Sequence, residues 1–383
     1  MIRLYIIDFF TSFCFVSNVM NLYFEHIGYS FTEIGILFGI LQVSKFIFEI
    51  PTGLIADKYG RKTSLVIGIV FQIISFFLLL INFNIIINLI AMILLGCAYT
   101  FSTGTTSAIL VEMCKIEKKD LYHANTISWY LYYIACGIGA ILSGVMISSS
   151  FNYVFYLDII SLVISLLILM SLNSKAVLEK EEHLKVKDVF EYLIQNKRLH
   201  YYILVGIIID FVMMPIDSLY NNYLYNDFNF SYSLIGFIVA AQFILQGVIV
   251  YVCEKMIAKI DKKFVVKLFP VFTMCIFFVF SIVRIAYISV IIYILGWMFY
   301  SSYISVFDTE KQNCISSKYR SSALSFESLL VAFGASGTKI LYGYLSDLIG
   351  MHITMTCFVL AGILFLLIIG NFYIDDLKQV KGG

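Results

Sequence analysis

Long apolar segments separated by short polar breaks run through almost the whole chain of 383 residues. A membrane-spanning helix needs about 20 mostly apolar residues. Twelve segments meet this requirement, at residues 4–25, 32–56, 63–82, 85–111, 124–148, 153–172, 200–225, 232–254, 264–283, 287–308, 321–345 and 352–373. The pattern predicts an all-α membrane protein with twelve transmembrane helices.

One connection is much longer than the others and divides the twelve segments into two sets of six. Residues 173–199 are polar and rich in Lys and Glu, and residues 186–193 have the periodicity of a helix. We therefore expect an N-terminal six-helix bundle over residues 1–172, a cytoplasmic linker over 173–199, and a C-terminal six-helix bundle with a short cytoplasmic tail over 200–383.

Lys and Arg gather on one side of this arrangement. Cytoplasmic loops of membrane proteins carry an excess of these residues, and 23 of the 26 Lys and Arg residues fall on one predicted side. The exceptions are Lys45, inside a span, and Arg284 and Lys339, at or near the opposite side. Both termini are therefore predicted to be cytoplasmic. The abundance of Ile, Phe, Tyr, Asn and Lys is typical of AT-rich bacterial genomes and favours a bacterial inner membrane.

The two halves resemble each other at an offset near 200 residues. Four pairs of segments occur in the same order, and they begin at Ser30 and Ser231, Ile55 and Ile257, Glu112 and Asp308, and Tyr122 and Tyr319. Two related six-helix bundles that rock around a site near the midplane are a common transporter architecture. The repeat therefore predicts two pseudo-symmetric bundles.

Composition narrows the class of protein further. The chain is 61% hydrophobic and only 13% charged, about half the usual share of charged residues. Its eight cysteines form no Cys-x-x-Cys pair or Cys/His cluster, so we expect no metal and no redox motif. No constellation of an enzyme and no phosphate-binding loop for ATP is found in the sequence. We expect a monomer without a cofactor or a nucleic-acid partner, whose N-terminus is the first span and not a removable signal.

A short charged turn joins the second and third segments, with the sequence Gly53-Leu-Ile-Ala-Asp57-Lys-Tyr-Gly60-Arg61-Lys62. It resembles the signature loop of the major facilitator superfamily, Gly-x-x-x-Asp-x-x-Gly-Arg-Lys, and the resemblance covers nearly the whole chain. The resemblance implies a secondary active transporter that works by alternating access.

The same resemblance assigns roles to the residues of this loop. Gly53 lets helices approach, Gly60 permits the turn, and Asp57 and Arg61 join a charge network with the opposite half. Further members of this gating network are Lys62, Glu112 and Arg320. A carboxylate at a helix end can also accept from the N-terminal amides of another helix. The alternative is a basic loop that only fixes the topology.

Within the superfamily, the segment Phe48-Glu-Ile-Pro-Thr-Gly53 resembles drug and macrolide exporters. Two features depart from the drug antiporters. Their Gly-Pro-x-x-Gly-Gly motif is replaced by Gly139-Ala-Ile-Leu-Ser-Gly144, and residues 85–111 contain no Lys or Arg. Export therefore rests on the overall resemblance, and proton coupling lacks two of its usual signs.

Ionisable side chains inside a bilayer cost about 2.5–3.5 kcal/mol or more and are candidates for function. Asp8 is either an interfacial carboxylate or a functional one. Lys45 and Glu49 are four residues apart in one helix. They form either a structural ion pair or a part of the coupling or gating machinery. Glu327 is a weaker candidate.

Asp210 and Asp217 are stronger candidates for function than Lys45 and Glu49. Their seven-residue spacing places them on one helix face, about 10 Å apart, with Pro215 between them. Asp210 is the main candidate for binding a proton or a cationic substrate, and the alternative is a hydrogen-bonded structural Asp.

Polar and aromatic residues in spans 1, 4, 7 and 10 are predicted to line a central cavity. They are Asn18, Asn21, Tyr99, Thr103, Thr106, Tyr220, Asn221, Trp297, Tyr300 and Tyr303. An aromatic and mildly acidic pocket suits amphipathic or cationic compounds.

The leading functional hypothesis is a secondary active exporter of hydrophobic or amphipathic small molecules that is coupled to protons. The alternative in the same class is a proton symporter that imports a small metabolite. A membrane sensor that transports nothing is disfavoured, because neither the linker nor the tail is long enough to supply a signalling domain.

Overall fold

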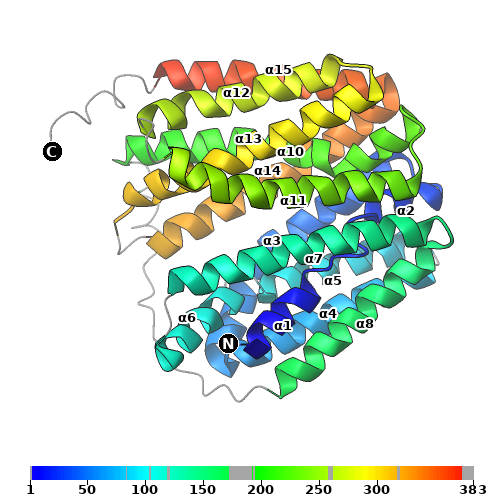
Figure 1. The fold of residues 1–383 in the computed structure, drawn as a ribbon, viewed down its shortest axis with the longest axis vertical. Helices are drawn as coiled ribbons and strands as arrows, with labels where there is room; N and C mark the ends of the chain where they lie inside the picture. Colours follow the sequence, from blue (N-terminus) through cyan, green and yellow to red (C-terminus); the bar gives the residue numbers. More distant parts are fainter. Residues whose placement is uncertain are drawn as a thin grey trace. The chain divides into compact units, whose positions relative to one another are not determined.

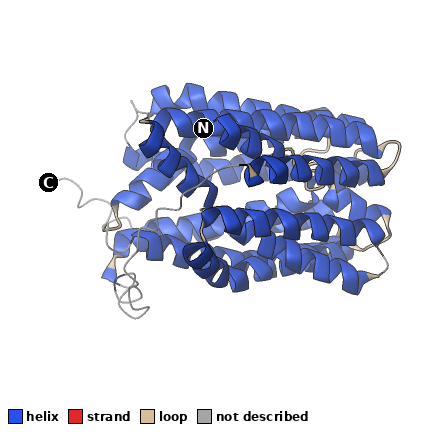
Figure 2. Cartoon of the chain, turned by 90° about the horizontal axis from the view of Figure 1, so that it is seen from below, coloured by secondary structure: helices blue, strands red, loops and turns tan. Residues whose placement is uncertain are grey.

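The computed structural model describes residues 2–82, 84–102, 105–118, 121–171, 192, 195–257, 262–316 and 320–372. The described residues form helices and loops, without any strand (Figure 2). The helices are α1 (Ile2–Thr11), α2 (Met20–His26), α3 (Phe31–Tyr59), α4 (Arg61–Ile81), α5 (Ile85–Ser102), α6 (Thr105–Glu117), α7 (Leu121–Ile147), α8 (Phe151–Met170), α10 (Lys197–Asn226), α11 (Tyr232–Ile257), α12 (Lys262–Ile282), α13 (Ala286–Asn313), α14 (Arg320–Ile349) and α15 (Met351–Phe372).

Ten of the twelve predicted spans agree with a helix to within a few residues; the exceptions are the first span and the fourth, residues 85–111, which corresponds to α5 and α6. The prediction of an all-α membrane protein is confirmed. In the described residues, ten helices are long and apolar enough to cross a membrane. The two predicted spans outside this set are the first, which is broken into α1 and α2, and the eleventh, which corresponds to α14. The predicted helix within residues 186–193 lies almost wholly outside the described residues.

The chain forms two compact units (Figure 1). Unit 1 contains Met1–Lys180 and Asn221–Gly247, and unit 2 contains Glu181–Tyr220 and Val248–Gly383. The end of α10 and most of α11 therefore group with the first half of the chain.

Small buried hydroxyl groups join the helices of unit 1. Helix α5 packs between α3 and α4, and α1 packs on α7 and α8. The Ser44 hydroxyl donates to the Ile93 carbonyl at 2.6 Å, and the Ser75 hydroxyl donates to the Ala91 carbonyl at 2.7 Å. Small residues and side-chain hydrogen bonds are the usual means of association for helices in lipid, where apolar burial gives little driving force.

The first span is interrupted between Thr11 and Met20, so the continuous helix expected over residues 4–25 is wrong. Non-helical backbone at membrane depth is tolerated only where protein or water satisfies its polar groups. Here the Ser143 hydroxyl donates to the Phe15 carbonyl at 2.9 Å, and the Asp158 carboxylate accepts from the Val16 amide at 2.8 Å. Helices α7 and α8 thus hold the break in place.

The internal repeat is visible in the backbone of unit 1. Gly28 and Asn229, 201 residues apart, both have positive φ angles, of 94° and 52°. Two residues later, the Ser30 hydroxyl accepts from the Glu33 amide at 3.2 Å and the Ser231 hydroxyl accepts from the Leu234 amide at 3.3 Å. The turn before α3 is therefore repeated before α11.

In unit 2, α12 packs on α13 and α15, and α14 packs on α15. The start of α10 is tied to the end of α13, because the Asn196 side chain donates to the Cys314 carbonyl at 2.7 Å.

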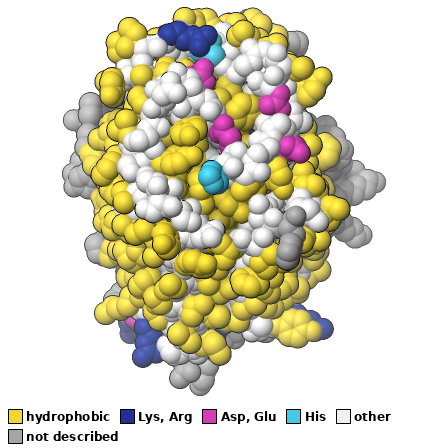
Figure 3. Space-filling view, turned by 90° about the vertical axis from the view of Figure 1, so that its right-hand side faces the viewer, with side chains coloured by type: hydrophobic (Ala, Val, Ile, Leu, Met, Phe, Trp, Pro, Cys, Tyr) yellow, Lys and Arg dark blue, Asp and Glu magenta, His cyan; other side chains and the backbone are white. Residues whose placement is uncertain are grey.

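Large apolar side chains face outward along many helices of both units, for example Leu167 at 63%, Phe333 at 66% and Leu364 at 61% exposed. On the face in Figure 3, hydrophobic side chains dominate, and the Lys and Arg side chains seen there lie at its upper and lower margins. Apolar exposure of this extent is unusual for a soluble monomer and is expected for helices that contact lipid.

Candidate functional site

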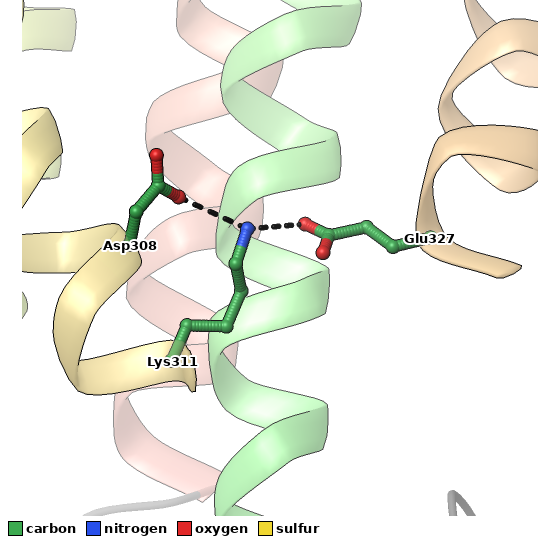
Figure 4. A network of polar contacts seen from close by, with 3 residues as sticks. All are labelled: Asp308, Lys311 and Glu327. Carbon is green, nitrogen blue, oxygen red and sulfur yellow. Dashed lines mark hydrogen bonds and ion pairs between the residues drawn. The ribbon is translucent and has the colours of Figure 1, made fainter. Parts of the chain in front are cut away.

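An ion-pair network joins α13 and α14 in unit 2 (Figure 4). The Lys311 ammonium lies 2.9 Å from a Glu327 oxygen and 3.0 Å from an Asp308 oxygen. The Lys311 and Glu327 side chains are 11% and 12% exposed, whereas that of Asp308 is 45% exposed. The contact between Lys311 and Glu327 is therefore the buried part of the network, and Asp308 is its solvent-accessible part.

Asp210 of α10 belongs to the same group of charges. It lies within electrostatic reach of Glu327, Lys311 and Asp308. The network thus brings three carboxylates around one lysine. When all of them are ionised, Lys311 offsets only one of the three negative charges.

Lys311 lies beyond the apolar part of α13, which ends at Asp308. Burial opposes its charged form, but the carboxylates of Glu327 and Asp308 together outweigh that effect and raise its pKa above the ordinary 10.5. Lys311 is therefore a fixed positive charge at physiological pH, and any proton exchanged by this group is carried by a carboxylate.

Asp217 takes part in a different group, so the structure separates the two α10 carboxylates. Its carboxylate accepts from the Tyr293 hydroxyl at 3.0 Å. The Tyr293 ring stacks on Tyr220, with centroids 3.5 Å apart. Pro215 lies inside α10, which runs without a break from Lys197 to Asn226.

The predicted cavity residues of unit 2 form an aromatic cluster. Trp297 meets Tyr300 edge to face, with ring centroids 5.7 Å apart. Tyr220 and Tyr303 are 2% and 0% exposed. These two residues pack against other aromatic rings and do not line an open space, whereas Trp297 and Tyr300 are partly exposed.

Lys45 in unit 1 is directed at an aromatic ring. Its ammonium group lies 4.8 Å from the centroid of the Tyr99 ring, and the Tyr99 hydroxyl lies 3.2 Å from the Ser17 hydroxyl in the break of the first span. Lys45 and Glu49 remain within electrostatic reach of each other. Within the described residues, however, they form no ion pair shorter than 4.0 Å.

A polar clamp, consisting of Asn18, Asn21, Glu25, Asn221, Asn222 and Asn226, joins α2 to the end of α10 within unit 1. The Asn222 and Asn226 side chains donate to the two Glu25 oxygens at 2.5 and 2.7 Å. The Asn221 side chain donates to the Asn18 carbonyl at 2.7 Å. These bonds connect residues that lie about 200 positions apart.

Sequence reasoning missed Glu25 and Asn222, although the repeat contained a signal. Asn21 and Asn222 are 201 residues apart, and so are Glu25 and Asn226. The clamp therefore joins equivalent positions of the two halves. The first half of the chain supplies the Glu25 carboxylate, and the second half supplies the amides of Asn222 and Asn226. Each carboxylate oxygen therefore has a donor.

The signature loop is described in part. Gly60 has a φ of 90° between α3 and α4, a conformation that favours glycine. The Lys62 ammonium donates to the Met170 carbonyl at 2.8 Å, which ties α4 to the end of α8. A Cβ atom on Gly53 would meet no described heavy atom within 4 Å.

The side chains of Asp57, Glu112 and Arg320 and the whole of Thr103 lie outside the described residues, as do their predicted contacts. Arg61 makes an interaction whose details lie outside them too.

The altered antiporter motif lies where helices approach closely. A Cβ atom on Gly139 would lie 1.8 Å from the Phe13 carbonyl oxygen in the break of the first span. A Cβ atom on Gly144 would lie 2.7 Å from the Cα atom of Gly236 in α11. Residues 139–144 therefore allow α7 to pack closely against the break of the first span and against α11, although the proline of the motif is absent.

Asp8 and Thr106, two further candidates, line a separate cavity in unit 1 with Ser128 and Trp129. Among the described residues, no group of three or more His, Cys, Asp or Glu side chains could hold a metal ion.

This chain belongs to the major facilitator superfamily, whose family model matches residues 3–313. It is 24% identical over 243 residues to MJ1560, an uncharacterized MFS-type transporter of Methanocaldococcus jannaschii, covering 61% of this chain and 62% of the relative. It is also 24% identical over 237 residues to YxaM, an uncharacterized MFS-type transporter of Bacillus subtilis, covering 58% of each. The matches thus span about three fifths of these relatives.

Solved structures of transporters share the fold. The nucleoside transporter NupG superposes with a TM-score of 0.80 at 13% identity, over 97% of this chain and 98% of NupG. A bacterial homologue of the human lysosomal transporter Spinster, in an inward-facing conformation, superposes with a TM-score of 0.76 at 12% identity, over 98% of this chain and 95% of the homologue. These solved structures therefore show the fold that the chain shares with them.

Proposed function

We propose that this chain is a secondary active transporter that works by alternating access and exports hydrophobic or amphipathic small molecules in exchange for protons. The observation that carries the proposal is the group of three carboxylates around Lys311 in unit 2. Asp210 lies inside a candidate membrane span, where a charged side chain is costly and is a candidate for function. The surplus negative charge can be offset by a proton or by a cation, which is what coupled exchange requires.

Asp210 is the carboxylate proposed to exchange the proton. Glu327 is held by Lys311 at 2.9 Å, and Asp308 is open to solvent. Asp210 lies near both of them but takes part in neither of these ion pairs. Its charge can therefore change without breaking the sheltered contact between Lys311 and Glu327.

The clamp around Glu25 supplies the second requirement of alternating access, a gate that opens and closes. In the proposed topology, with both termini in the cytoplasm of a bacterium, the turns after α2 and α10 lie on the outer side of the inner membrane. The hydrogen bonds of Glu25 then keep the outer side closed. They must break when the protein opens outward.

The test compares drug susceptibility and dye accumulation in cells that express the wild-type protein or Asp210→Asn. We expect the wild type to lower dye accumulation and Asp210→Asn to lose most of this effect. Asp217→Asn is the matched control, because its amide oxygen can still accept from Tyr293. Full efflux by Asp210→Asn would remove the assignment of the carboxylate. A wild type without any phenotype would favour the import of a metabolite.

A further inference from the structure

A cavity of about 250 Å³ opens between α1, α6 and α7 in unit 1. Its lining residues take no part in the carboxylate group of unit 2 that the proposed function uses. Its lining consists of Asp8, Thr11, Ser12, Thr106, Leu110, Ser128, Trp129 and Tyr132. Its volume is slightly below the range of about 300–1,000 Å³ that is typical of ligand pockets, so it suits a small ligand or one end of a larger one.

The cavity has one acidic group and an aromatic wall. Asp8 is the sole charged residue among the lining residues. Trp129 and Tyr132 meet edge to face with centroids 5.8 Å apart, and Tyr133 packs against both of them. An indole ring and a phenol ring next to a carboxylate attract organic cations through cation–π contacts and direct charge attraction.

The polar groups of this cavity are not saturated by the protein. The buried Ser128 hydroxyl lies beside the Asp8 carboxyl but makes no hydrogen bond of normal geometry within the described residues. No lysine or arginine in the described residues lies within 4.0 Å of the Asp8 carboxylate. A ligand with a positive charge and a flat apolar part would supply the charge partner that Asp8 lacks and would pack on the aromatic wall.

We propose that this cavity binds the cationic end of the transported compound, with Asp8 as the counter-charge and Trp129 and Tyr132 as the aromatic wall. The assignment rests on the proposed function for its biological meaning, but binding itself can be tested alone. It selects organic ammonium compounds with an aromatic group over neutral compounds of the same shape. It excludes anions, because they would meet the Asp8 carboxylate.

The binding test uses benzyltrimethylammonium and its uncharged analogue of equal shape, neopentylbenzene. Trp129 and Trp297 are the two tryptophans of the chain, so Trp297→Phe leaves Trp129 as the only indole reporter. In this variant we expect a saturable change of Trp129 fluorescence with benzyltrimethylammonium. Adding Asp8→Asn should raise the Kd for the cation at least tenfold while the Kd for neopentylbenzene changes less than twofold.

Glu33→Gln is the matched control, because it removes a carboxylate of the same unit that lies outside this cavity and away from the break of the first span. It should leave both Kd values unchanged. Retained binding of neopentylbenzene shows that Asp8→Asn still folds. An unchanged affinity of Asp8→Asn for benzyltrimethylammonium, or a fluorescence response that survives in Trp129→Phe through Trp297, would overturn the assignment.

A transport assay separates this proposal from the proposed function. In proteoliposomes, Asp8→Asn should raise the KM for ethidium about tenfold relative to the wild type. If the wild type binds benzyltrimethylammonium through Asp8 but moves no cation, export fails and the binding site stands. If the wild type moves ethidium and Asp8→Asn does so with an unchanged KM, the binding site fails and export stands.

Discussion

Gly139 faces the carbonyl oxygen of Phe13 so closely that no larger residue fits without a shift of the backbone. A Cβ atom there would lie 1.8 Å from that oxygen, whereas real contacts of this kind are longer than 3 Å. The neighbouring Ser143 is fully buried and donates to the Phe15 carbonyl and to the Gly139 carbonyl. The motif of α7 therefore supports the break in the first span.

Gly139→Ala should destabilise the protein by about 1–3 kcal/mol, the usual effect of overpacking a tight contact. Gly337→Ala is the control, because a Cβ atom at Gly337 would meet no described heavy atom within 4 Å. Thermal unfolding of the purified protein in detergent measures both variants. An unchanged Tm for Gly139→Ala would contradict the close contact between α7 and the break.

Lys311 sets the charge balance of its group at every physiological pH. Its pKa is raised above 10.5, so the stabilisation it provides is present below that value and is lost only as the pH rises through the raised pKa. Between about pH 5 and pH 9, Lys311 is therefore a constant positive charge beside the carboxylates of Asp308 and Glu327.

Lys311→Gln should move the midpoint of the pH profile of transport upward by about one pH unit or more. The carboxylates lose their opposite charge and hold a proton more strongly. Lys311→Arg keeps the charge and should leave the midpoint near that of the wild type. Transport rates measured over a range of pH test this, and equal midpoints for Lys311→Gln and the wild type would show that Lys311 does not act on the titrating group.

At the scale of helices, the broken first span is connected to the clamp through α2, which carries Glu25. Helix α2 is only seven residues long and is held at its far end by the side chains of Asn222 and Asn226. The bonds to Glu25 are charge-assisted and contribute about 1.5–3 kcal/mol each. A change of about 1.4 kcal/mol corresponds to tenfold in a population, so loss of the carboxylate should open this end markedly.

Glu25→Ala should raise the rate at which a cysteine at position 18 reacts with a membrane-impermeant maleimide from outside the cell about tenfold, in a background without other cysteines. Replacing Asn18 leaves the clamp bond from Asn221 intact, because that bond uses the backbone carbonyl of residue 18. Glu33→Ala is the control, since Glu33 caps α3 at the same end and takes no part in the clamp. Equal labelling rates in Glu25→Ala and the wild type would contradict the gate.

The sequence predicted helices well where a local pattern determines them, and it failed where distant residues do. The limits of α7 and α10 follow from apolar periodicity and polar ends. The break after Thr11 could not be predicted, because residues 12–19 contain no Pro or Gly and the support of the break comes from Ser143 and Asp158, more than 120 positions away.

The candidate site divides in the same way. The carboxylates were found because charge is rare in spans, but their grouping was not. Asp210 and Asp217 share a face of α10, but they face different residues of α13. Asp210 interacts electrostatically with Lys311, whereas Asp217 accepts a hydrogen bond from Tyr293. Only the packing of neighbouring helices decides such groupings.

At the scale of the whole molecule, the chain belongs to the major facilitator superfamily and carries an internal repeat. The repeat is seen in the turns at Gly28 and Asn229 and in the clamp between equivalent positions. Alternating access follows from this architecture as a proposal. The carboxylate group of unit 2 supplies the proposed link to protons.

The most direct test places the purified protein in proteoliposomes, imposes a pH gradient, and follows ethidium and internal pH at the same time. The account predicts that the wild type moves ethidium against its concentration gradient while protons move in the opposite direction, and that Asp210→Asn loses the response to the pH gradient. Ethidium movement that ignores the pH gradient, or that runs in the same direction as the protons, would contradict it.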